Sequence, residues 1–333
     1  MRVILYGAGS IGGTLAVLMA EQGANLTVVA HGEEKARLFR EEGFRITGVY
    51  GDHCQKLKAV SSAEELEGVF DIALIATKYQ QMPDAARELL PYLAEDSLVA
   101  SLQNGLCLDL LSEVVGEART VGVMIGFGAT QLEANLVEVT AGAELVIGMR
   151  NGLTSPKLEP LRALLDGCVK TSITEDIEGK LFAKLIFNCI INAMAAVTAG
   201  PVGQSMKTRK ARSVVLGIIS EGVAVAEAMN ITVPRFNIMP KFQLMARSGR
   251  LGRKLWGRFL QLALSIASGD VRPSTLQSLE KGKPTEVDIM NGYLSAQGRA
   301  LGVPTPVNDS LTRIIKEIES GVRPLTPGNL KDV

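Results

Sequence analysis

A polar stripe on an otherwise apolar segment holds the residues best suited to chemistry. In KLFAKLIFNCIINAMAAV (180–197), a polar residue recurs at every fourth position from 180 to 192 and the rest are apolar; the polar residues are Lys180, Lys184, Asn188 and Asn192. Steps of four keep side chains on one face of a helix, so the four form a narrow row. Polar groups in apolar surroundings need partners, which a substrate can supply. Desolvation also lowers the pKa of a lysine toward neutrality, which suits Lys184 to donate a proton.

Two interpretations of this stripe stay open on the residues alone. A solvent-exposed face would explain its polarity, although such a face usually covers a wider arc of a helix. A substrate-facing row explains its narrowness, with Lys184 as proton donor and Asn188 and Asn192 as hydrogen-bonding neighbours. Lys180 is nearer the expected helix start after Thr174, and we expect it to be solvated.

A second group of polar residues lies in RPSTLQSLEKGKPTEVDIMNG (272–292). Thr285 is followed three residues later by Asp288, as in a capping box, so a helix is predicted to begin near Pro284. Glu286 would then lie in its first turn, where an acid can serve merely to complement the helix dipole. The spacing by itself therefore does not establish a catalytic role for Glu286.

The first thirty residues predict a dinucleotide-binding unit. An apolar run ends at Tyr6, a glycine turn follows, a helix pattern runs to about Gln22, and a second apolar strand covers 26–30. In such a G-x-G-x-x-G turn the glycines permit a tight bend, a close approach to pyrophosphate and close packing of helix on strand. A glycine turn without a ligand is the alternative. The predicted cofactor-binding residues of the turn are Gly7, Ala8, Gly9, Ser10, Ile11 and Gly12.

The end of the second strand bears on the choice of dinucleotide. An Asp or Glu there would bind the ribose 2′-hydroxyl of NAD, but this chain has His31. Lys35 and Arg37 lie close by and favour the 2′-phosphate of NADP, whereas Glu33 and Glu34 oppose it. The sequence therefore favours NADP, with His31 as a candidate cofactor contact.

Two further apolar runs, 70–78 and 96–105, end in polar residues. They resemble strands of a parallel sheet buried on both faces, and ligands gather beyond the carboxyl ends of such strands. Lys78 and Asn104 are therefore predicted to touch cofactor or substrate. The runs between 120 and 148 alternate and turn at Gly and Asn, which predicts antiparallel strands that close the sheet.

Length and composition predict a soluble protein of two domains, and the patterns of strands and helices predict the α/β class. With 333 residues, the chain is long enough for a Rossmann-type NADP-binding domain at 1–170 and a helical substrate and catalytic domain at 171–333. Lys plus Arg equals Asp plus Glu at 35 each, which gives no electrostatic case for nucleic-acid binding. The four cysteines are far apart and indicate neither a metal site nor disulfides, so we expect a cytoplasmic protein. A membrane span is not favoured, because no uncharged apolar stretch reaches 18 residues. A homodimer stays open.

The segment 235–261 is basic, with seven Lys or Arg, no acid, and Phe, Leu, Met and Trp256 interleaved. Three interpretations remain. It could be a basic amphipathic helix on a membrane surface, or a lid that places positive potential over an anionic substrate. It could also be a solvated basic face that packs its apolar side on the domain.

Taken together, the motifs resemble the ketopantoate reductase (2-dehydropantoate 2-reductase) family over nearly the whole chain. The matching stretches are GAGSIGG, the strand end at Lys78, SLQNG, KLIFNCIIN and STLQSLEKGKPTEVDIMNG. The resemblance implies a Rossmann-type N-terminal domain followed by an all-α domain like the C-terminal domain of 6-phosphogluconate dehydrogenase. It also implies NADPH-dependent reduction of ketopantoate to pantoate, a step of pantothenate and coenzyme A synthesis.

The resemblance further implies roles for single residues. Lys184 is similar to the catalytic lysine that protonates the ketone oxygen, and Glu286 to the acid that binds a substrate hydroxyl and orients that lysine. Where members of the family often have an arginine for the 2′-phosphate, this chain has His31. Three alternatives stay open: a reductase of another 2-oxo acid, a 3-hydroxyacid or glycerol-phosphate dehydrogenase, and a non-catalytic NADP-binding sensor with a membrane-surface helix. By resemblance, Asn104, Asn188, Asn192 and Ser274 bind substrate, while Lys78 and Asn104 contact the cofactor.

Overall fold

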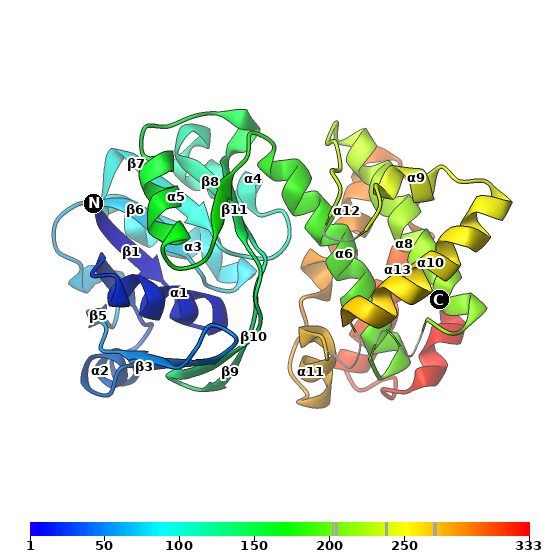
Figure 1. The fold of residues 1–333 in the computed structure, drawn as a ribbon, viewed down its shortest axis with the longest axis horizontal. Coiled ribbons are helices and arrows are strands. Elements are labelled where there is room, and N and C mark those ends of the chain that lie inside the picture. Colours follow the sequence, from blue (N-terminus) through cyan, green and yellow to red (C-terminus); the bar gives the residue numbers. More distant parts are fainter. Residues whose placement is uncertain (202, 204–205, 237–238, 269–271) are drawn as a thin grey trace. The chain divides into compact units, whose positions relative to one another are not determined.

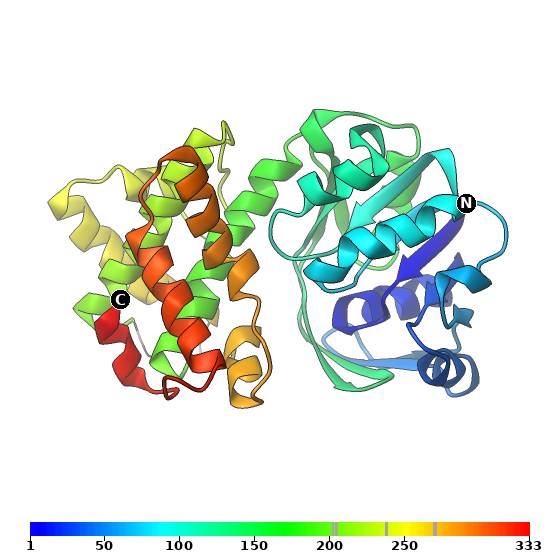
Figure 2. The ribbon, with the colours of Figure 1, turned by 180° about the vertical axis from the view of Figure 1, so that it is seen from behind.

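A computed structural model of the chain describes residues 1–201, 203, 206–236, 239–268 and 272–333, and in helix α10 it leaves out the side chains of 250 and 265–268. The chain divides into two compact units, Met1–Leu181 and Phe182–Val333, which are described one by one (Figures 1 and 2). The predicted domain boundary at residue 170 stays a prediction.

The N-terminal unit is built on an eight-stranded sheet in the order β12-β11-β8-β7-β6-β1-β2-β5. The central strands are parallel, and β1 sets Tyr6 opposite both Val29 of β2 and Ile75 of β6. The carboxyl ends of these strands therefore share one edge. The strands are β1 (Arg2–Tyr6), β2 (Asn25–Val29), β5 (Ala59–Val60), β6 (Phe70–Ile75), β7 (Leu93–Ser101), β8 (Thr120–Ile125), β11 (Leu145–Met149) and β12 (Thr171–Ile173).

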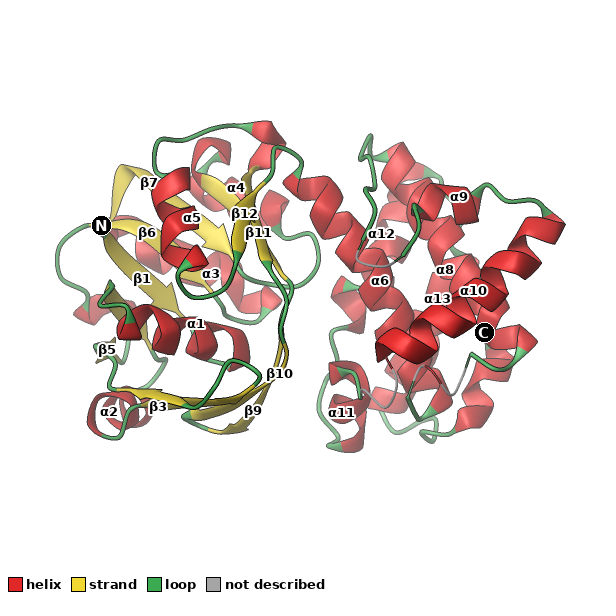
Figure 3. Ribbon diagram, in the orientation of Figure 1, coloured by secondary structure: helices red, strands yellow, loops and turns green. Residues whose placement is uncertain are grey.

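Helices cover both faces of this sheet (Figure 3). Successive strand residues point to opposite faces, so Leu5 packs with α1 and α5, and Ile4 with α3 and α4. This two-sided burial explains the continuous apolar runs of the strands. The helices are α1 (Ser10–Glu21), α2 (Glu33–Glu41), α3 (Met82–Leu89), α4 (Leu108–Val115) and α5 (Leu158–Asp166), with short 3₁₀ helices η1 (Ala63–Glu65), η2 (Tyr79–Gln81), η3 (Leu90–Tyr92), η4 (Glu117–Arg119) and η5 (Arg150–Gly152).

A second, four-stranded sheet has the order β4-β3-β10-β9, from β3 (Phe44–Gly48), β4 (His53–Gln55), β9 (Gly128–Glu133) and β10 (Leu136–Ala141). The prediction that residues 120–148 close the main sheet was therefore only half right. β11 does pair antiparallel with β8, but the β9–β10 hairpin pairs with β3 in the second sheet. Alternation in the sequence shows that a strand forms and not which partner it takes.

Where the structure describes it, the C-terminal unit is helical apart from loops. Helix α8 begins with a hydrogen bond in which the Thr208 side chain accepts from the Ala211 N–H, and it contacts α9, α10, α12 and α13. The predicted fold class, a Rossmann-type domain followed by a helical domain, is confirmed. The helices are α6 (Ile177–Thr198), α8 (Arg209–Ala228), α9 (Phe242–Ala246), α10 (Arg250–Ser268), α11 (Ser274–Glu280), α12 (Asn291–Leu301) and α13 (Pro306–Glu319), with η6 (Val287–Ile289) and η7 (Pro327–Asp332).

Helix α6 is long and apolar enough, by length and composition, to cross a membrane, but 78% of its most apolar 18-residue window is buried inside the protein. Core helices satisfy the same criterion, so it is weak evidence for a span. Phe182, Ile186 and Ile190 are fully buried. Most of the apolar residues of the segment 180–197 therefore belong to the core.

The helix predicted to begin near Pro284 does not start there. A 3₁₀ turn, η6, comes first, and α12 begins at Asn291. Thr285 Oγ1 accepts a hydrogen bond from the Val287 N–H at 3.2 Å, while the Asp288 carboxylate pairs with Lys316 at 2.9 Å instead of closing a capping box. Lys316, which is distant along the chain, therefore pairs with the acid that the sequence pattern predicted to cap the helix.

Candidate active site

Lys184 lies half-buried on α6, with buried neighbours on both sides along the chain. Burial lowers the pKa of its ammonium from 10.5 to about 8, and the negative charge of Glu286 opposes that shift. The lysine is therefore placed to exchange a proton near neutral pH, with a carboxylate that favours its charged form. The structure brings Lys184 and Glu286, 102 positions apart in the numbering, into one electrostatic neighbourhood.

Glu286 sits at the start of η6 and is half-buried. Its chain neighbour Thr285 is held by Glu319 of α13, which accepts from both the Thr285 N–H (2.7 Å) and its hydroxyl. Because the neighbouring backbone is tied to α13, η6 presents Glu286 from a fixed turn. Whether Glu286 acts in catalysis stays a prediction.

Asn192 is buried, and both ends of its amide are engaged by the protein. Its Oδ1 accepts from the Ser274 hydroxyl at 3.3 Å and from the Thr275 N–H at 3.4 Å, and its Nδ2 donates to the Asn188 carbonyl at 3.1 Å. Asn192 therefore ties the first turn of α11 to α6 and positions the exposed Ser274. The predicted substrate contacts of Asn188, Asn192 and Ser274 stay predictions, and the structure adds this positioning role for Asn192.

A buried network that the sequence analysis missed supports this region. Glu221 of α8 accepts hydrogen bonds from the N–H groups of Val307 and Asn308 (2.8 and 2.9 Å) and from the Asn308 amide (2.7 Å). The Asn308 Oδ1 in turn accepts from Asn291 Nδ2 at 2.9 Å, at the first residue of α12 after η6. Burial raises the pKa of Glu221, and these three donors oppose the rise. An acid inside the apolar run LGIISEGVAVA was the available signal.

Replacing Glu221 tests the network. Glu221→Gln should lower the free energy of unfolding by about 1–3 kcal/mol, because an amide cannot accept from all three donors and leaves a buried group unsatisfied. Glu227→Gln on the same helix is the matched control, since Glu227 is exposed and among the described residues pairs with Arg247 alone. It should change the free energy by less than about 0.5 kcal/mol. Urea denaturation of both variants measures the two free energies of unfolding. Equal losses of stability would contradict the role of Glu221 in a buried network.

The glycine turn of the N-terminal unit fits a dinucleotide. Gly7 has a φ of +96°, and a Cβ on Gly12 would lie 2.0 Å from the Gly7 carbonyl oxygen, so both positions require glycine. In front of Gly9 the nearest atom to such a Cβ is 3.9 Å away, which leaves the backbone open to a ligand. The turn leads into the N-terminus of α1, which has no acid in its first turn and whose N–H groups suit a phosphate. Ser10 and Ile11 are the first residues of that helix.

The other predicted cofactor residues lie at the same edge of the sheet. Lys78 follows β6 and is exposed, while Asn104 follows β7 and is half-buried. Gln103 joins the two loops, because its Nε2 donates to the carbonyls of Ile75 (3.0 Å) and Thr77 (3.2 Å). His31 follows β2, is exposed, and has a φ of +56°. Parallel strand order thus gathers all these residues at one edge, and their contacts stay predictions.

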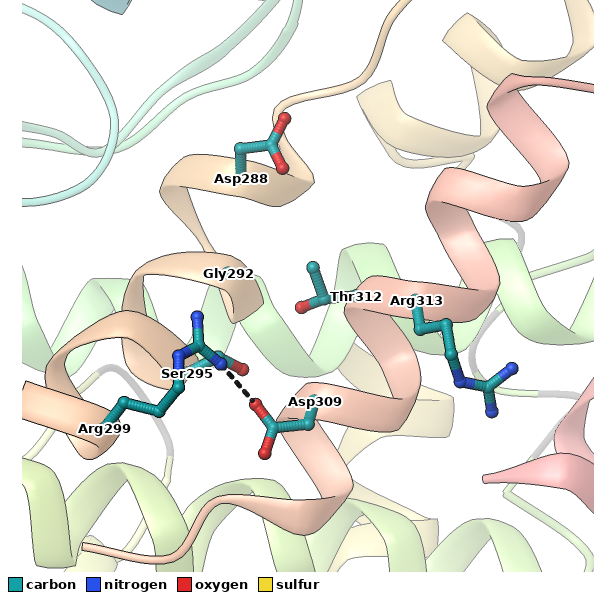
Figure 4. A pocket seen from close by; sticks show the side chains of 7 residues that line it. All are labelled: Asp288, Gly292, Ser295, Arg299, Asp309, Thr312 and Arg313. Atoms are coloured by element: carbon teal, nitrogen blue, oxygen red, sulfur yellow. Dashed lines mark hydrogen bonds and ion pairs between the residues drawn. The ribbon is translucent and has the colours of Figure 1, made fainter. Parts of the chain in front are cut away.

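A separate hollow of about 330 Å³ lies between α12, α13 and η6 (Figure 4). Its charged groups are engaged in ion pairs, Arg299 with Asp309 at 3.2 Å and Arg313 with Glu317 at 2.7 Å. It is lined by Asp288, Gly292, Ser295, Arg299, Asp309, Thr312 and Arg313, and none of the predicted site residues is among them. This hollow is therefore not the site predicted from the sequence.

Two models of one protein family match this chain. The family model for Ketopantoate reductase PanE/ApbA matches residues 3–152, and the model for Ketopantoate reductase PanE/ApbA C terminal matches residues 176–319. The chain belongs to the ketopantoate reductase family. The resemblance inferred from its motifs is thereby confirmed, and both the glycine turn and the Lys184 helix fall inside the matched regions.

Individual relatives of this family cover the same length. A 2-dehydropantoate 2-reductase of Mesorhizobium japonicum is 23% identical over 345 residues, covering 96% of this chain and 98% of that protein. A solved ketopantoate reductase from Ralstonia eutropha JMP134 is 26% identical with a TM-score of 0.81, covering 96% and 99%. D-mandelate dehydrogenase, solved with NADH and anilino(oxo)acetate, has a TM-score of 0.79 at 20% identity, covering 97% and 99%, and therefore shares the fold.

Proposed function

We propose that this ketopantoate reductase family member is a cytoplasmic enzyme that reduces 2-dehydropantoate to pantoate with NADPH, with Lys184 as the proton donor. The observation that carries the proposal is Lys184 on an apolar helix, with a pKa lowered to about 8 and the Glu286 charge beside it. An ammonium with this pKa is mostly protonated at neutral pH and gives up its proton readily. The names of the relatives support the substrate, since several are 2-dehydropantoate 2-reductases.

A nicotinamide dinucleotide supplies the hydride when it is bound. Gly9 and the first turn of α1 would hold its pyrophosphate, because the N-terminus of a helix offers N–H groups to an anion and the space in front of Gly9 is open. Gly7 and Gly12 would shape the turn, and the Gly7 N–H itself donates to the Val29 carbonyl at 3.1 Å. Lys78 and Asn104 would contact its ribose and nicotinamide side.

The substrate is held by residues of the C-terminal unit. Lys184 donates its proton to the ketone oxygen as negative charge develops there, so that no histidine is needed. Glu286 accepts a hydrogen bond from a substrate hydroxyl and keeps Lys184 charged. Ser274 binds the substrate carboxylate, and Asn188 and Asn192 complete the row along α6.

A reductase of another 2-oxo acid is the second candidate. D-mandelate dehydrogenase has the same fold and was solved with NADH and a 2-oxo acid analogue. In this chain, His31 stands where many family members have a basic residue for the 2′-phosphate. Both the acid and the dinucleotide therefore need a direct test.

The test is a panel of 2-oxo acids assayed with NADPH and with NADH. We expect the highest kcat/KM for 2-dehydropantoate with NADPH, measured from the loss of absorbance of the reduced nicotinamide. A higher value for an aryl 2-oxo acid such as phenylglyoxylate, or for NADH, would contradict the proposed substrate or cofactor. Binding of NADPH without turnover of any acid would favour the non-catalytic sensor.

A further inference from the structure

Helix α10 has two apolar faces, and only one of them is covered within its unit. Toward α8, Gly257 lies against Arg212, and Leu260 and Leu264 are fully buried. The other face is a stripe of large apolar side chains at steps of four, four and three residues, which places them on one side of the helix. This stripe consists of Leu251 (73% exposed), Leu255 (63%), Phe259 (39%) and Leu262 (63%).

Cations run along one edge of this apolar stripe. Lys254 and Arg258 are exposed one helical turn apart, and neither forms an ion pair with the part of the chain that the structure describes. On the other edge, Trp256 packs edge-on against Phe259 with ring centres 5.8 Å apart. From Arg235 to Ser268 the chain has seven Lys or Arg and no acid. The exposed face of α10 is therefore apolar in the middle, cationic on one edge and aromatic on the other.

We propose that α10 binds the surface of an anionic phospholipid bilayer. Helices with Lys and Arg beside a stripe of Leu, Phe and Trp lie in the plane of the interface, with the apolar side chains at the boundary of headgroups and acyl chains. Lys254 and Arg258 then contact anionic headgroups, and Trp256 lies at the headgroup level, where its ring is favoured. The covered face of α10 stays packed on α8, so binding requires no unfolding of the unit.

The charges favour this occupant over an antiparallel contact with a second copy of the chain. In a symmetric antiparallel contact through the stripe, the Lys254 and Arg258 edge of one copy would lie beside the same edge of the other. Like charges brought together in this way disfavour association. An anionic surface meets the same edge with the opposite charge.

The test is flotation of the protein with vesicles of phosphatidylglycerol mixed with phosphatidylcholine and with vesicles of phosphatidylcholine alone. We expect at least about tenfold stronger partition to the anionic vesicles, weakening as salt is raised. Leu255→Gln with Leu262→Gln, and separately Lys254→Gln with Arg258→Gln, should each lower that partition about tenfold or more. Lys56→Gln with Lys58→Gln is the charge-matched control on exposed lysines of the N-terminal unit and should leave it unchanged.

Three results would overturn the proposal, provided that thermal unfolding shows the variants folded. The first is no preference for anionic vesicles, or a loss in the control as large as in the α10 variants. The second is a concentration-dependent dimer that the leucine variant abolishes, which would assign the stripe to a second copy. The third is a raised KM for an anionic substrate in the cation variant with unchanged vesicle binding, which would make α10 a lid. The vesicle assay needs no catalytic activity, so it is independent of the proposed reaction.

Discussion

Lys184→Met should lower kcat/KM for reduction of the 2-oxo acid at least about 100-fold, because the general acid is lost while the volume of the side chain is nearly kept. Lys180→Met is the matched control, one helical turn earlier on the same face of α6. Its kcat/KM should stay within about twofold of the value for the unsubstituted enzyme. The measurement is steady-state kinetics on both variants. Normal turnover by the Lys184 variant would remove the mechanism.

The pH dependence gives the same lysine a second signature. Since the pKa of Lys184 is about 8, its ammonium is lost above that pH, and kcat/KM for reduction should fall about tenfold per pH unit there. Oxidation of the hydroxy acid needs the neutral amine and should fall below pH 8. The Glu286 charge raises the pKa of Lys184, so Glu286→Gln should move both breaks to lower pH. If the breaks of the two pH profiles do not move, Glu286 does not affect the pKa of Lys184.

Stability should change in the opposite sense to activity. The pKa of Lys184 is lowered from 10.5 to about 8 on folding, so the unfolded chain binds the proton more tightly. The destabilisation that comes from burying the charged ammonium is fully present below pH 8 and disappears as pH rises from 8 to 10.5. Lys184→Met should therefore raise the free energy of unfolding at pH 7 by about 1–3 kcal/mol. The loss of the attraction between Lys184 and the Glu286 carboxylate reduces this gain. The gain should vanish near pH 10.5, which denaturation at both pH values measures.

Gly12→Ala should abolish dinucleotide binding and destabilise the N-terminal unit by about 3 kcal/mol or more. Its Cβ would lie 2.0 Å from the Gly7 carbonyl oxygen and 2.9 Å from Ala76 Cβ, and neither atom is the end of a flexible side chain. The turn and the helix would have to separate. Thermal denaturation and a fluorescence titration with NADPH measure the two effects.

Gly9→Ala separates the fold of this turn from its ligand. Its Cβ would meet no atom closer than 3.9 Å, so the variant should fold with unchanged stability. It should bind NADPH at least about tenfold more weakly, because the methyl occupies the space that the pyrophosphate approaches. Equal losses of stability in the two variants would show that steric crowding alone does not set the requirement for glycine. Undiminished binding by Gly9→Ala would place the cofactor elsewhere.

Local patterns in the sequence determined the fold class and the family. The glycine turn, the apolar strands and the change to helical periodicity depend on neighbouring residues, so each can be recognised without the fold. The same holds for Lys184 as a candidate acid, because its apolar neighbours within one helical turn already predict a desolvated amine. The fold class and the family agree with the structure and with the family models. Burial does lower the pKa of Lys184, and its role as the acid stays a prediction.

Only the tertiary structure decided which distant groups meet. It pairs β10 with β3, gives Asp288 to Lys316 in place of a helix cap, and engages Asn192 with α11. It also buries Glu221 against the start of α13 and leaves the Leu255 face of α10 exposed. Each outcome depends on residues far apart along the chain competing for the same partner or surface. Spacing within a segment shows which face a side chain takes and not what lies opposite it.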